Sequence, residues 1–534
     1  DSSGDFVNDL TSKIITVTIE DTMAIILRYG SSPTNVKLPI HNTNQDGLLN
    51  LKVDWGDGTI TYGKILKEGL DITKDTEIKI SFGSEIGILK WAEETSTLDG
   101  GIKRMLRSVE RFFQNTNKIE FLKGGFFNCK RLTKIDKMRY GFVTGTAAYL
   151  FTYCENLTTI DSDIFSWSSN GDFTQCFAYS GISHVDSDLF ANTPTVRVCS
   201  EMFTVCKNLT SVSNFYIHRQ CTHVDDMFSG CPNLTSVNND IFKNAGNVTS
   251  AQKMFYQDTS LQETPDLGYL TGVVNCESMF EFSGIQNVSN SNFPINCSNA
   301  DSMFLYSKLS LSNSSLNIRS TYLNRLQSTF AYCENLGDLT KITLNCSNVT
   351  TVQNLFLSTG INSVPANYFS NLRKCVNFTS VFASCKNLQY IYGEKESSPF
   401  YGCPATTVAA AFNNCVNLQG DVRNIFYSIA SLNLDSNQLS WNMEGVSKTC
   451  LDYSDCFNNC TSLTGEPCYT QLTITQNRRG IYYIKLLPAF EDNKIVPSEY
   501  ASRAYFNLIN SKHAGCFRGC DRLSGITTIP LSWR

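Results

Sequence analysis

Apolar and polar positions along most of the chain follow one phrase: an apolar residue, Phe, two variable residues, a small or thiol residue, then Leu or Ile. It reads Met-Phe-Ser-Gly-Cys-Pro-Asn-Leu at 227–234. The phenylalanines of this repeat phrase are Phe126, Phe151, Phe177, Phe203, Phe228, Phe255, Phe280, Phe304, Phe330, Phe356, Phe382, Phe412, Phe457 and Phe517. The first ten steps between them are 25, 26, 26, 25, 27, 25, 24, 26, 26 and 26 residues. A period in this range predicts a solenoid, in which each coil packs only on its neighbours.

Each coil is predicted to contain a short strand and a tight turn. In the unit from Met227 to Met254 the phrase leads into Leu-Thr-Ser-Val at 234–237, whose β-branched residues predict a strand. The Asp-Ser-Met-Phe type of segment around the repeat Phe is predicted to form one helical or 3₁₀ turn. One strand per coil gives a parallel sheet along the solenoid. The repeat Phe and Leu are predicted to form the core.

Residues 1–100 carry no repeat and are predicted to form an antiparallel β-sandwich. Short apolar or alternating runs predict strands at 13–19, 24–29, 51–55, 59–62 and 77–82. The turn Gly56-Asp57-Gly58 between two of these runs predicts a β-hairpin. Residues 101–125 hold a degenerate form of the phrase and are predicted to be a transition or N-terminal cap.

The repeat spacing changes after Phe382. The next steps are 30, 45 and 60 residues, which places insertions near 391–402, 421–450 and 465–511. The solenoid is therefore predicted to span 126–534, with about 14 coils. The insertions are expected to place five residues in loops, namely Arg478, Arg479, Tyr482, Tyr483 and Tyr500. The simple repeat pattern therefore does not settle the structure of the C-terminal third.

Two motifs resemble known families. Val-Asp-Trp-Gly-Asp-Gly-Thr at 53–59 resembles the hairpin of PKD-like sandwich domains, which implies a spacer or binding module without catalytic residues. The recurring Phe-x-x-Cys-x-Asn-Leu-Thr-Ser-Val resembles the BspA-like leucine-rich repeat family of bacterial surface proteins. That resemblance implies a leucine-rich-repeat solenoid, an extracellular or surface-anchored location on a bacterium, and adhesion to host or bacterial partners.

Composition excludes some classes of partner. A net charge of -5 gives no electrostatic reason to expect nucleic acid, and no run of Lys or Arg is present that would hold an anionic membrane. No apolar stretch is long enough for a transmembrane helix. The chain opens Asp-Ser-Ser-Gly, which is typical of a trimmed N-terminus, so we expect a lipid anchor to be possible upstream of Asp1. We expect a monomer.

Cysteine placement argues against a disulfide scaffold. Nine cysteines stand three residues after the repeat Phe: Cys129, Cys154, Cys206, Cys231, Cys333, Cys385, Cys415, Cys460 and Cys520. Other repeats have a different residue there: Ser180, Asp258, Ser283, Ser307 and Thr359. A disulfide partner could not be exchanged so freely, whereas a small buried side chain could. We therefore predict mostly reduced, buried thiols.

No motif predicts catalysis, and no cofactor is expected. Residues 58–65 nearly match the phosphate-binding GxxxxGK[S/T] loop, but Ile65 stands where the Mg²⁺ ligand is required. His218, Cys221 and His223 form either a polar turn or an incomplete metal site, because Zn²⁺ needs three or four converging ligands. No metal site is predicted from them.

Two further patterns leave alternatives open. Asp54 and Asp57 could contribute to a Ca²⁺ site, although a role in the turn is favoured for Asp57. Asn-x-Ser/Thr recurs at Asn156, Asn208, Asn233, Asn247 and Asn348. These asparagines are either glycan acceptors or a ladder whose side chains satisfy backbone groups, and their fixed place in the repeat favours the ladder.

The position two residues after the repeat Phe carries the candidate binding residues. Aromatic residues occupy it in five repeats: Tyr153, Tyr179, Phe282, Tyr306 and Tyr332. Other repeats have Gly230, Ser384, Asn414 or Asn459 there. A packed core would not tolerate such changes of volume, so the position is predicted to lie on the surface. The last three aromatics could form an exposed stripe for glycan or protein, or could simply shield the edges of the coils.

Three functions are compatible with these patterns. The favoured one is a non-enzymatic recognition or adhesion protein that binds a protein or glycan, at a cell surface or in a matrix, through the solenoid face. The alternative is a structural spacer that projects from the cell. The third is an enzyme whose cleft is built by the C-terminal insertions.

Overall fold

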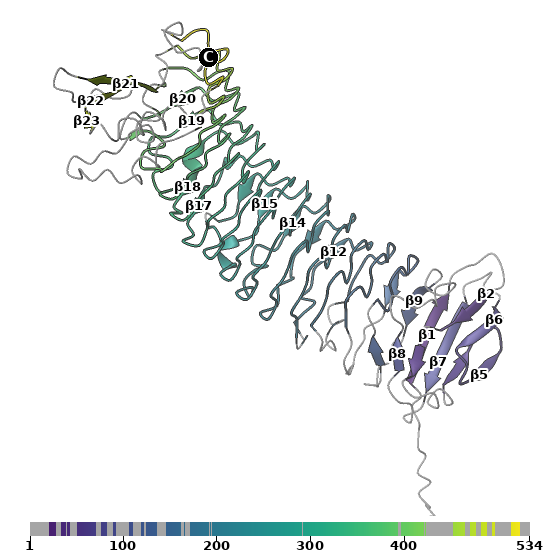
Figure 1. Cartoon of the computed structure of the whole chain (residues 1–534). Helices are drawn as coiled ribbons and strands as arrows, with labels where there is room; N and C mark the ends of the chain where they lie inside the picture. The colour runs from purple at the N-terminus through teal and green to yellow at the C-terminus, as the bar shows by residue number, and fades with distance from the viewer. Residues whose placement is uncertain are drawn as a thin grey trace, which may run out of the picture.

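The structure is an elongated array of coils with a β-domain at its N-terminal end (Figure 1). The computed structural model describes residues 21–27, 34–38, 40–42, 51–70, 76–82, 89–91, 106–110, 119–121, 124–135, 146–161, 165, 171–191, 193, 195–290, 292–393, 397–420, 422, 425, 452–464, 470–476, 482–488, 494–496 and 514–523. The described part is almost entirely β-structure and turns. Its helices are two 3₁₀ turns, η2 (Leu267–Tyr269) and η3 (Leu339–Lys341).

The N-terminal part consists of mostly antiparallel sheets. Its strands are β1 (Asp21–Leu27), β2 (Thr34–Lys37), β3 (Ile40–Asn42), β4 (Lys52–Asp54), β5 (Ile60–Tyr62), β6 (Leu66–Leu70), β7 (Thr76–Phe82), β8 (Leu89–Trp91), β9 (Leu106–Glu110) and β10 (Ile119–Phe121). The largest sheet has the order β11-β9-β1-β7-β4-β5, a smaller one has the order β10-β8-β3, and β2 pairs with β6. The predicted N-terminal antiparallel sheet is therefore confirmed.

The hairpin predicted around Gly56 is confirmed. β4 pairs antiparallel with β5, and the Trp55 N–H donates to the Thr59 carbonyl oxygen at 3.1 Å. Trp55 is fully buried with Ile78 and Ile80 of β7, because alternate residues of a half-buried strand face the core. The strand predicted at 77–82 is β7, and the one predicted at 24–29 overlaps β1. The strand predicted at 13–19 lies outside the described residues.

The N-terminal sheet continues into the array. β9 pairs antiparallel with β1 on one side and parallel with β11 (Lys134–Ile135) on the other. β11 belongs to the coil of Phe126, and the Thr133 N–H of that coil donates to the Arg107 carbonyl oxygen at 2.8 Å. β9, which lies within 101–125, thus joins the N-terminal sheet to the coil of Phe126 through backbone hydrogen bonds.

The coils form the predicted parallel sheet. Their short strands are β12 (His184–Val185), β13 (Ser211–Val212), β14 (Ser236–Val237), β15 (Glu263–Thr264), β16 (Asn287–Val288), β17 (Leu316–Ile318), β18 (Ile342–Leu344), β19 (Ser363–Val364) and β20 (Tyr390–Ile391). Parallel pairs join β12-β13-β14, β15-β16, β17-β18 and β19-β20. A second line of single parallel bridges runs from Asp172 to Asp452. Parallel contacts therefore join neighbouring coils along two lines, of which the first consists of separate short sheets.

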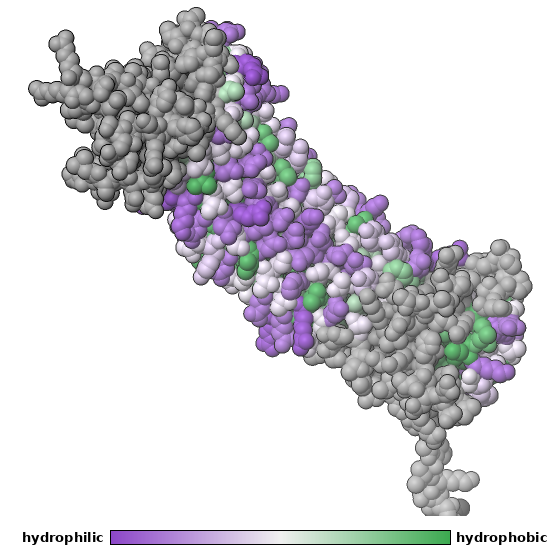
Figure 2. All heavy atoms as spheres, viewed as in Figure 1, coloured by the Kyte–Doolittle hydropathy of each residue, from purple (hydrophilic) through white to green (hydrophobic). Residues whose placement is uncertain are grey.

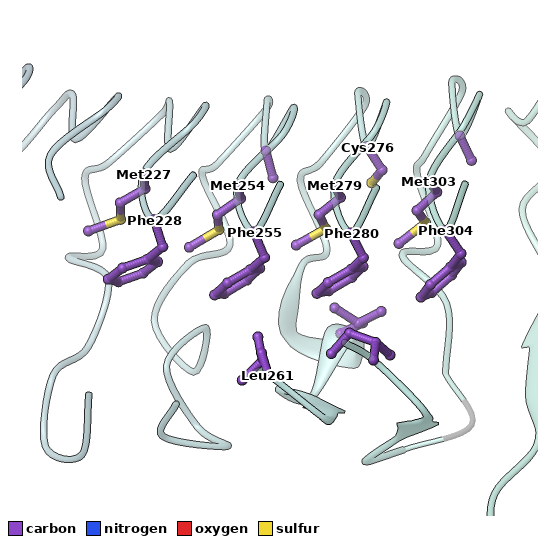
Figure 3. Packing of buried hydrophobic residues seen from close by; sticks show 14 of the residues in the cluster. Met227, Phe228, Met254, Phe255, Leu261, Cys276, Met279, Phe280, Met303 and Phe304 are labelled. Atoms are coloured by element: carbon purple, nitrogen blue, oxygen red, sulfur yellow. The ribbon is translucent and has the colours of Figure 1, made fainter. Parts of the chain in front are cut away.

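The repeat phenylalanines form one continuous stack at the centre of the array. Neighbouring rings lie nearly parallel, with centroids 5.2 to 5.8 Å apart from Phe126 to Phe517. Figure 3 shows four of these rings, each beside the Met that precedes it. Phe412, Phe457 and Phe517 keep the same spacing although 45 and 60 residues separate them. The insertions therefore do not interrupt the stack.

The segment around the repeat Phe is not the helical turn that was predicted. The residues two before and two after it have positive φ, as at Ser302 (57°) and Tyr306 (58°). A helix needs consecutive right-handed residues, so this alternation excludes one. The N–H groups of Ser302, Phe304 and Tyr306 instead donate to carbonyl oxygens of the next coil, at 2.8, 2.9 and 3.0 Å. We call these six residues, from two before the Phe to three after it, the turn segment.

The insertion after Phe457 contains a small antiparallel sheet. Its strands are β21 (Thr470–Gln476), β22 (Tyr482–Pro488) and β23 (Lys494–Val496). Tyr482 and Tyr483, which were predicted to lie in a loop, therefore lie in β22, because the run of aromatic and aliphatic residues pairs with β21. Arg478, Arg479 and Tyr500 lie outside the described residues.

Candidate recognition surface

The five candidate aromatic residues share one backbone position at the end of the turn segment. All have a left-handed conformation, with φ between 57° and 60°. Each N–H is fixed by a hydrogen bond to the next coil, as in Tyr332 N–H to the Leu357 carbonyl oxygen at 2.7 Å. The backbone therefore holds their side chains at the same place in successive coils.

The structure brings these residues together in two groups. Tyr153 stacks on Tyr179 with ring centroids 4.7 Å apart. Phe282, Tyr306 and Tyr332 form a second group, which we call the aromatic stripe, with centroid distances of 4.8 and 4.2 Å. Val205, Gly230 and Gln257 occupy the equivalent positions between the two groups, so one continuous stripe is not formed.

The aromatic stripe is partly exposed, as predicted. Tyr306 retains 44% of its accessible surface and Phe282 retains 38%, whereas Tyr332 is half-buried. Partial desolvation raises the pKa of Tyr306, and the neighbouring Tyr332 hydroxyl raises it further. The rings thus both stack on one another and present apolar surface to solvent, and their role in recognition stays a prediction.

Two residues beside the stripe were not predicted from the sequence. Tyr256 meets Phe282 edge-on, with centroids 5.9 Å apart and an interplanar angle of 90°. Lys253 Nζ lies 5.7 Å from the centroid of the Tyr256 ring. The sequence signal was available, because Tyr256 directly follows a repeat Phe one coil before the stripe. These residues extend the stripe by an aromatic edge and a positive charge.

Much of the surface of the array is polar. On the face of the array drawn in Figure 2, hydrophobic residues occur singly among hydrophilic ones. Isolated apolar residues are ordinary on protein surfaces, whereas a row of stacked rings is not. The aromatic stripe is therefore the distinctive apolar feature that we consider for recognition.

Four of the five asparagines of the glycosylation-like sites form the predicted ladder. The side-chain amides of Asn156, Asn233 and Asn247 each donate to a backbone carbonyl oxygen of the preceding coil at 2.8 Å, and that of Asn348 does so at 2.5 Å. The acceptors are Lys130, Lys207, Arg219 and Thr321. The recurring Asn therefore has a structural role that explains its fixed place.

The predicted buried thiols are also confirmed within the described residues, where nineteen cysteines are buried and reduced. The remaining two, Cys450 and Cys468, lie outside them. In the column three residues after the repeat Phe, the thiol donates to the carbonyl oxygen of the preceding repeat Phe, as from Cys385 Sγ to Phe356 at 3.0 Å. Burial raises the pKa of Cys385 to about 11, which keeps it protonated and unreactive.

The carboxylates of the N-terminal hairpin accept hydrogen bonds from residues of its turn. Asp54 Oδ1 accepts from the Gly56 N–H at 3.0 Å, and Asp57 Oδ1 accepts from the N–H and hydroxyl of Thr59. Burial alone would raise the pKa of Asp57, but hydrogen bonds from Lys67 and Thr59 lower it to about 2. The role predicted for Asp57 in the turn is confirmed. Residues 58–65 run through β5 and not through a strand-loop-helix, so they do not form a phosphate loop.

A pocket of about 530 Å³ contains His218 together with Asp188, Tyr216 and Arg219. Burial lowers the pKa of His218 and raises that of Asp188. The His218 Nδ1 accepts from the Gln220 N–H at 3.3 Å, which leaves the ring neutral and already engaged. In the part of the chain that the structure describes, no three His, Cys, Asp or Glu side chains could hold a metal ion.

Comparisons with known proteins add a family description and a similar solved structure. Residues 107–239 and 172–293 match a family model described as "Mycoplasma protein of unknown function, DUF285". A leucine-rich repeat protein from Bacteroides ovatus ATCC 8483 is similar over 69% of this chain and 92% of its own, with 16% sequence identity and a TM-score of 0.36. No curated protein matches. Among the described residues, no helix is both long enough and apolar enough to cross a membrane.

Proposed function

We propose that this chain is a non-enzymatic recognition protein of the bacterial cell surface, which binds a protein or glycan partner through the outer edge of its solenoid. The observation that carries the proposal is the aromatic stripe, where three rings on successive coils are stacked and partly exposed. Aromatic rings held in place give contact area at a low cost in conformational entropy. The PKD-like hairpin and the BspA-like repeat phrase support the extracellular, adhesive setting.

The geometry of the array is also suited to binding a partner. Coils that hydrogen-bond along their whole length form a stiff, extended surface, which is how solenoids present binding faces. Lys253 beside Tyr256 adds a positive charge at one end of the aromatic stripe. We expect a partner with an apolar or sugar-ring surface and acidic groups near that end.

A glycan and host-protein binding array with the full chain tests this proposal. We expect at least one reproducible partner, whose signal falls in the triple variant Phe282→Ser, Tyr306→Ser, Tyr332→Ser. The double variant Ser358→Ala, Ser384→Ala, at the same position of later coils, is the matched control and should bind as the unmodified chain does. If nothing binds, the alternative of a structural spacer that projects from the cell replaces the proposal.

A further inference from the structure

The largest sheet of the N-terminal domain ends in a strand whose outer edge is open. In the order β11-β9-β1-β7-β4-β5, β5 lies last and pairs only with β4 among the described strands. It is bounded by Gly58 and Gly63, whose positive φ values of 89° and 66° end the extended run. The last strand of a sheet presents a row of backbone groups that can pair with another strand.

The backbone groups of Ile60 and Tyr62 point to this open edge. Next to them, the Trp55 N–H of the hairpin donates to the Thr59 carbonyl oxygen. Hydrogen-bonded pairs alternate along an antiparallel ladder, so Thr61 is bonded to β4, whereas Ile60 and Tyr62 direct their N–H and C=O groups away from it. Within the described ranges, neither residue has a backbone hydrogen bond on that outer side.

The side chains at this edge are apolar and exposed. Tyr62 retains 65% of its accessible surface and Ile60 retains 51%, and Leu66, four residues later in β6, is also exposed. Figure 2 shows hydrophobic residues grouped on the part of the N-terminal domain where Figure 1 labels β5 and β6. Ile, Thr and Tyr all favour strands, and β5 has none of the Lys or Pro residues that commonly protect an edge from pairing.

A second copy of β5 satisfies this edge in one register. When two β5 strands run antiparallel with Thr61 at the two-fold axis, Ile60 of each strand lies opposite Tyr62 of the other. Both residues direct their backbone groups outward, so each of these pairs exchanges two N–H to C=O hydrogen bonds. Ile60 and Tyr62 are two residues apart and share one face of the sheet, so their side chains form an apolar cluster across the contact.

The charges beside β5 fit the same register. Beyond Tyr62, the register places Lys64 opposite Gly58 of the second copy, and thus next to Asp57 of that copy. Lys64 and Asp57 are both exposed and opposite in sign, and the two-fold axis makes this contact twice. β5 itself carries no charge, so no like charges oppose each other along the paired strands.

We propose that two copies of this chain associate by antiparallel pairing of their β5 strands, so that the two N-terminal domains share one continuous sheet. This departs from the monomer expected from the sequence. The contact is short, and contacts below the standard interface size are weak, so the dimer forms only at micromolar concentration or above. The inference goes beyond the recognition role and uses none of the residues of the aromatic stripe. A dimer carries two recognition surfaces, which strengthens binding to a partner that is itself repeated on a surface.

Sedimentation velocity of the full chain at about 1 μM and about 200 μM tests the association. We expect single chains at the low concentration and pairs of chains at the high one. Tyr62→Lys puts a charge at the contact and should raise the dissociation constant at least tenfold. Its melting temperature should equal that of the unmodified chain, because the Tyr62 ring is exposed. Tyr322→Lys is the matched control, since Tyr322 is 63% exposed and lies in the solenoid, between β17 and β18.

Hydrogen exchange resolved to single residues locates the contact. The amide hydrogens of Ile60 and Tyr62 should exchange more slowly at the high concentration, whereas that of Thr61, which is bonded to β4 in either state, should not change. The proposal is overturned if the chain stays monomeric, if Tyr62→Lys associates as the unmodified chain does, or if the two amide hydrogens do not slow on association. Amide hydrogens of Ile60 and Tyr62 that are already protected in the monomer would show that a segment of the same chain covers β5, which also overturns the dimer.

Discussion

Asp258 occupies a position that other coils fill with Cys, Ser or Thr. It is completely buried three residues after Phe255, and burial raises its pKa well above the ordinary value of 3.8. Its Oδ1 accepts from the Cys231 N–H at 2.8 Å, while Oδ2 has no partner. Burial therefore favours the protonated form of this carboxyl, at a position where other coils have a small side chain.

The first prediction concerns this carboxyl. Because its folded pKa is raised, the folded chain binds a proton that the unfolded chain releases, so its contribution to stability is full below about pH 4 and is lost as the pH rises. Asp258→Ser should raise the free energy of unfolding at pH 7 by about 1–3 kcal/mol. The gain should shrink toward pH 4, which melting curves between pH 4 and pH 8 will measure. A gain that does not depend on pH would show that Asp258 is ionised in the folded chain.

A second prediction compares the effect of an alanine substitution at two glycines of adjacent coils. A Cβ added at Gly360 would lie 2.1 Å from the Glu334 carbonyl oxygen, whereas one added at Gly337 would have nothing within 4 Å. Gly360→Ala should therefore force the coils apart and cost about 1–3 kcal/mol. Gly337→Ala, the matched control, should leave the melting temperature unchanged or slightly higher. Equal effects of the two substitutions would contradict the close approach of the coils at Gly360.

The sequence predicted side-chain roles better than backbone conformation. The buried thiols, the Asn ladder and the partial exposure of Tyr306 followed from which residues exchange at one position of the repeat. The left-handed backbone conformation of Tyr306 did not follow from the sequence. Hydrogen bonds to the next coil impose this conformation on residue types that do not favour it. A signal was present, since Gly230 and Asn414, of types that tolerate positive φ, stand at the equivalent position.

At the scale of the element, the turn segment is the unit that joins one coil to the next. Alternate N–H groups donate to the following coil, and the remaining ones close turns within the segment, as from Cys333 to the Phe330 carbonyl oxygen at 3.2 Å. The thiol of Cys333 donates backward to the Phe304 carbonyl oxygen at 3.1 Å. Each turn segment is therefore hydrogen-bonded to the coil that follows it and to the coil that precedes it. The thiol donates the hydrogen bond to the preceding coil.

The third prediction follows from this bonding. Burial raises the pKa of Cys206 to about 11 and that of Cys333 to about 12, so both thiols should react with a thiol reagent only after unfolding. Counting labelled cysteines by mass spectrometry, before and after denaturation, checks this. Cys333→Ser should be tolerated, since Ser307 occupies the same position one coil earlier, whereas Cys333→Leu should destabilise the array. Disulfide-linked peptides from the column would contradict the prediction.

The turn at 312–313 could not be predicted from the repeat. The shortened step before Phe304 was visible, but nothing in the residues around Leu311 indicates a turn where neighbouring coils have a strand. The Ser314 N–H closes this turn by donating to the Leu311 carbonyl oxygen at 3.4 Å, a contact that the repeat period does not encode. Departures from the repeat are therefore found only when the coils are stacked.

At the scale of the whole molecule, the phenylalanine stack runs through the array from Phe126 to Phe517. Its rings keep their spacing through the long steps to Phe457 and Phe517, and the N-terminal sheet joins the first coil through β9 and β11. The solenoid and its core could be predicted because periodicity encodes them directly. The β-strands inside the last insertion could not, because that segment has no repeat to compare with.

The most direct test of the recognition role is the dissociation constant of the strongest partner from the binding array, measured for the unmodified chain and for the triple variant Phe282→Ser, Tyr306→Ser, Tyr332→Ser. Exposed aromatic anchors that carry binding cost more than about 1 kcal/mol each when removed, so we predict a rise of at least tenfold. The core stack from Phe280 to Phe330 is separate from these residues, so the melting temperature should stay within about 4 °C. An unchanged dissociation constant in a correctly folded variant would contradict the account.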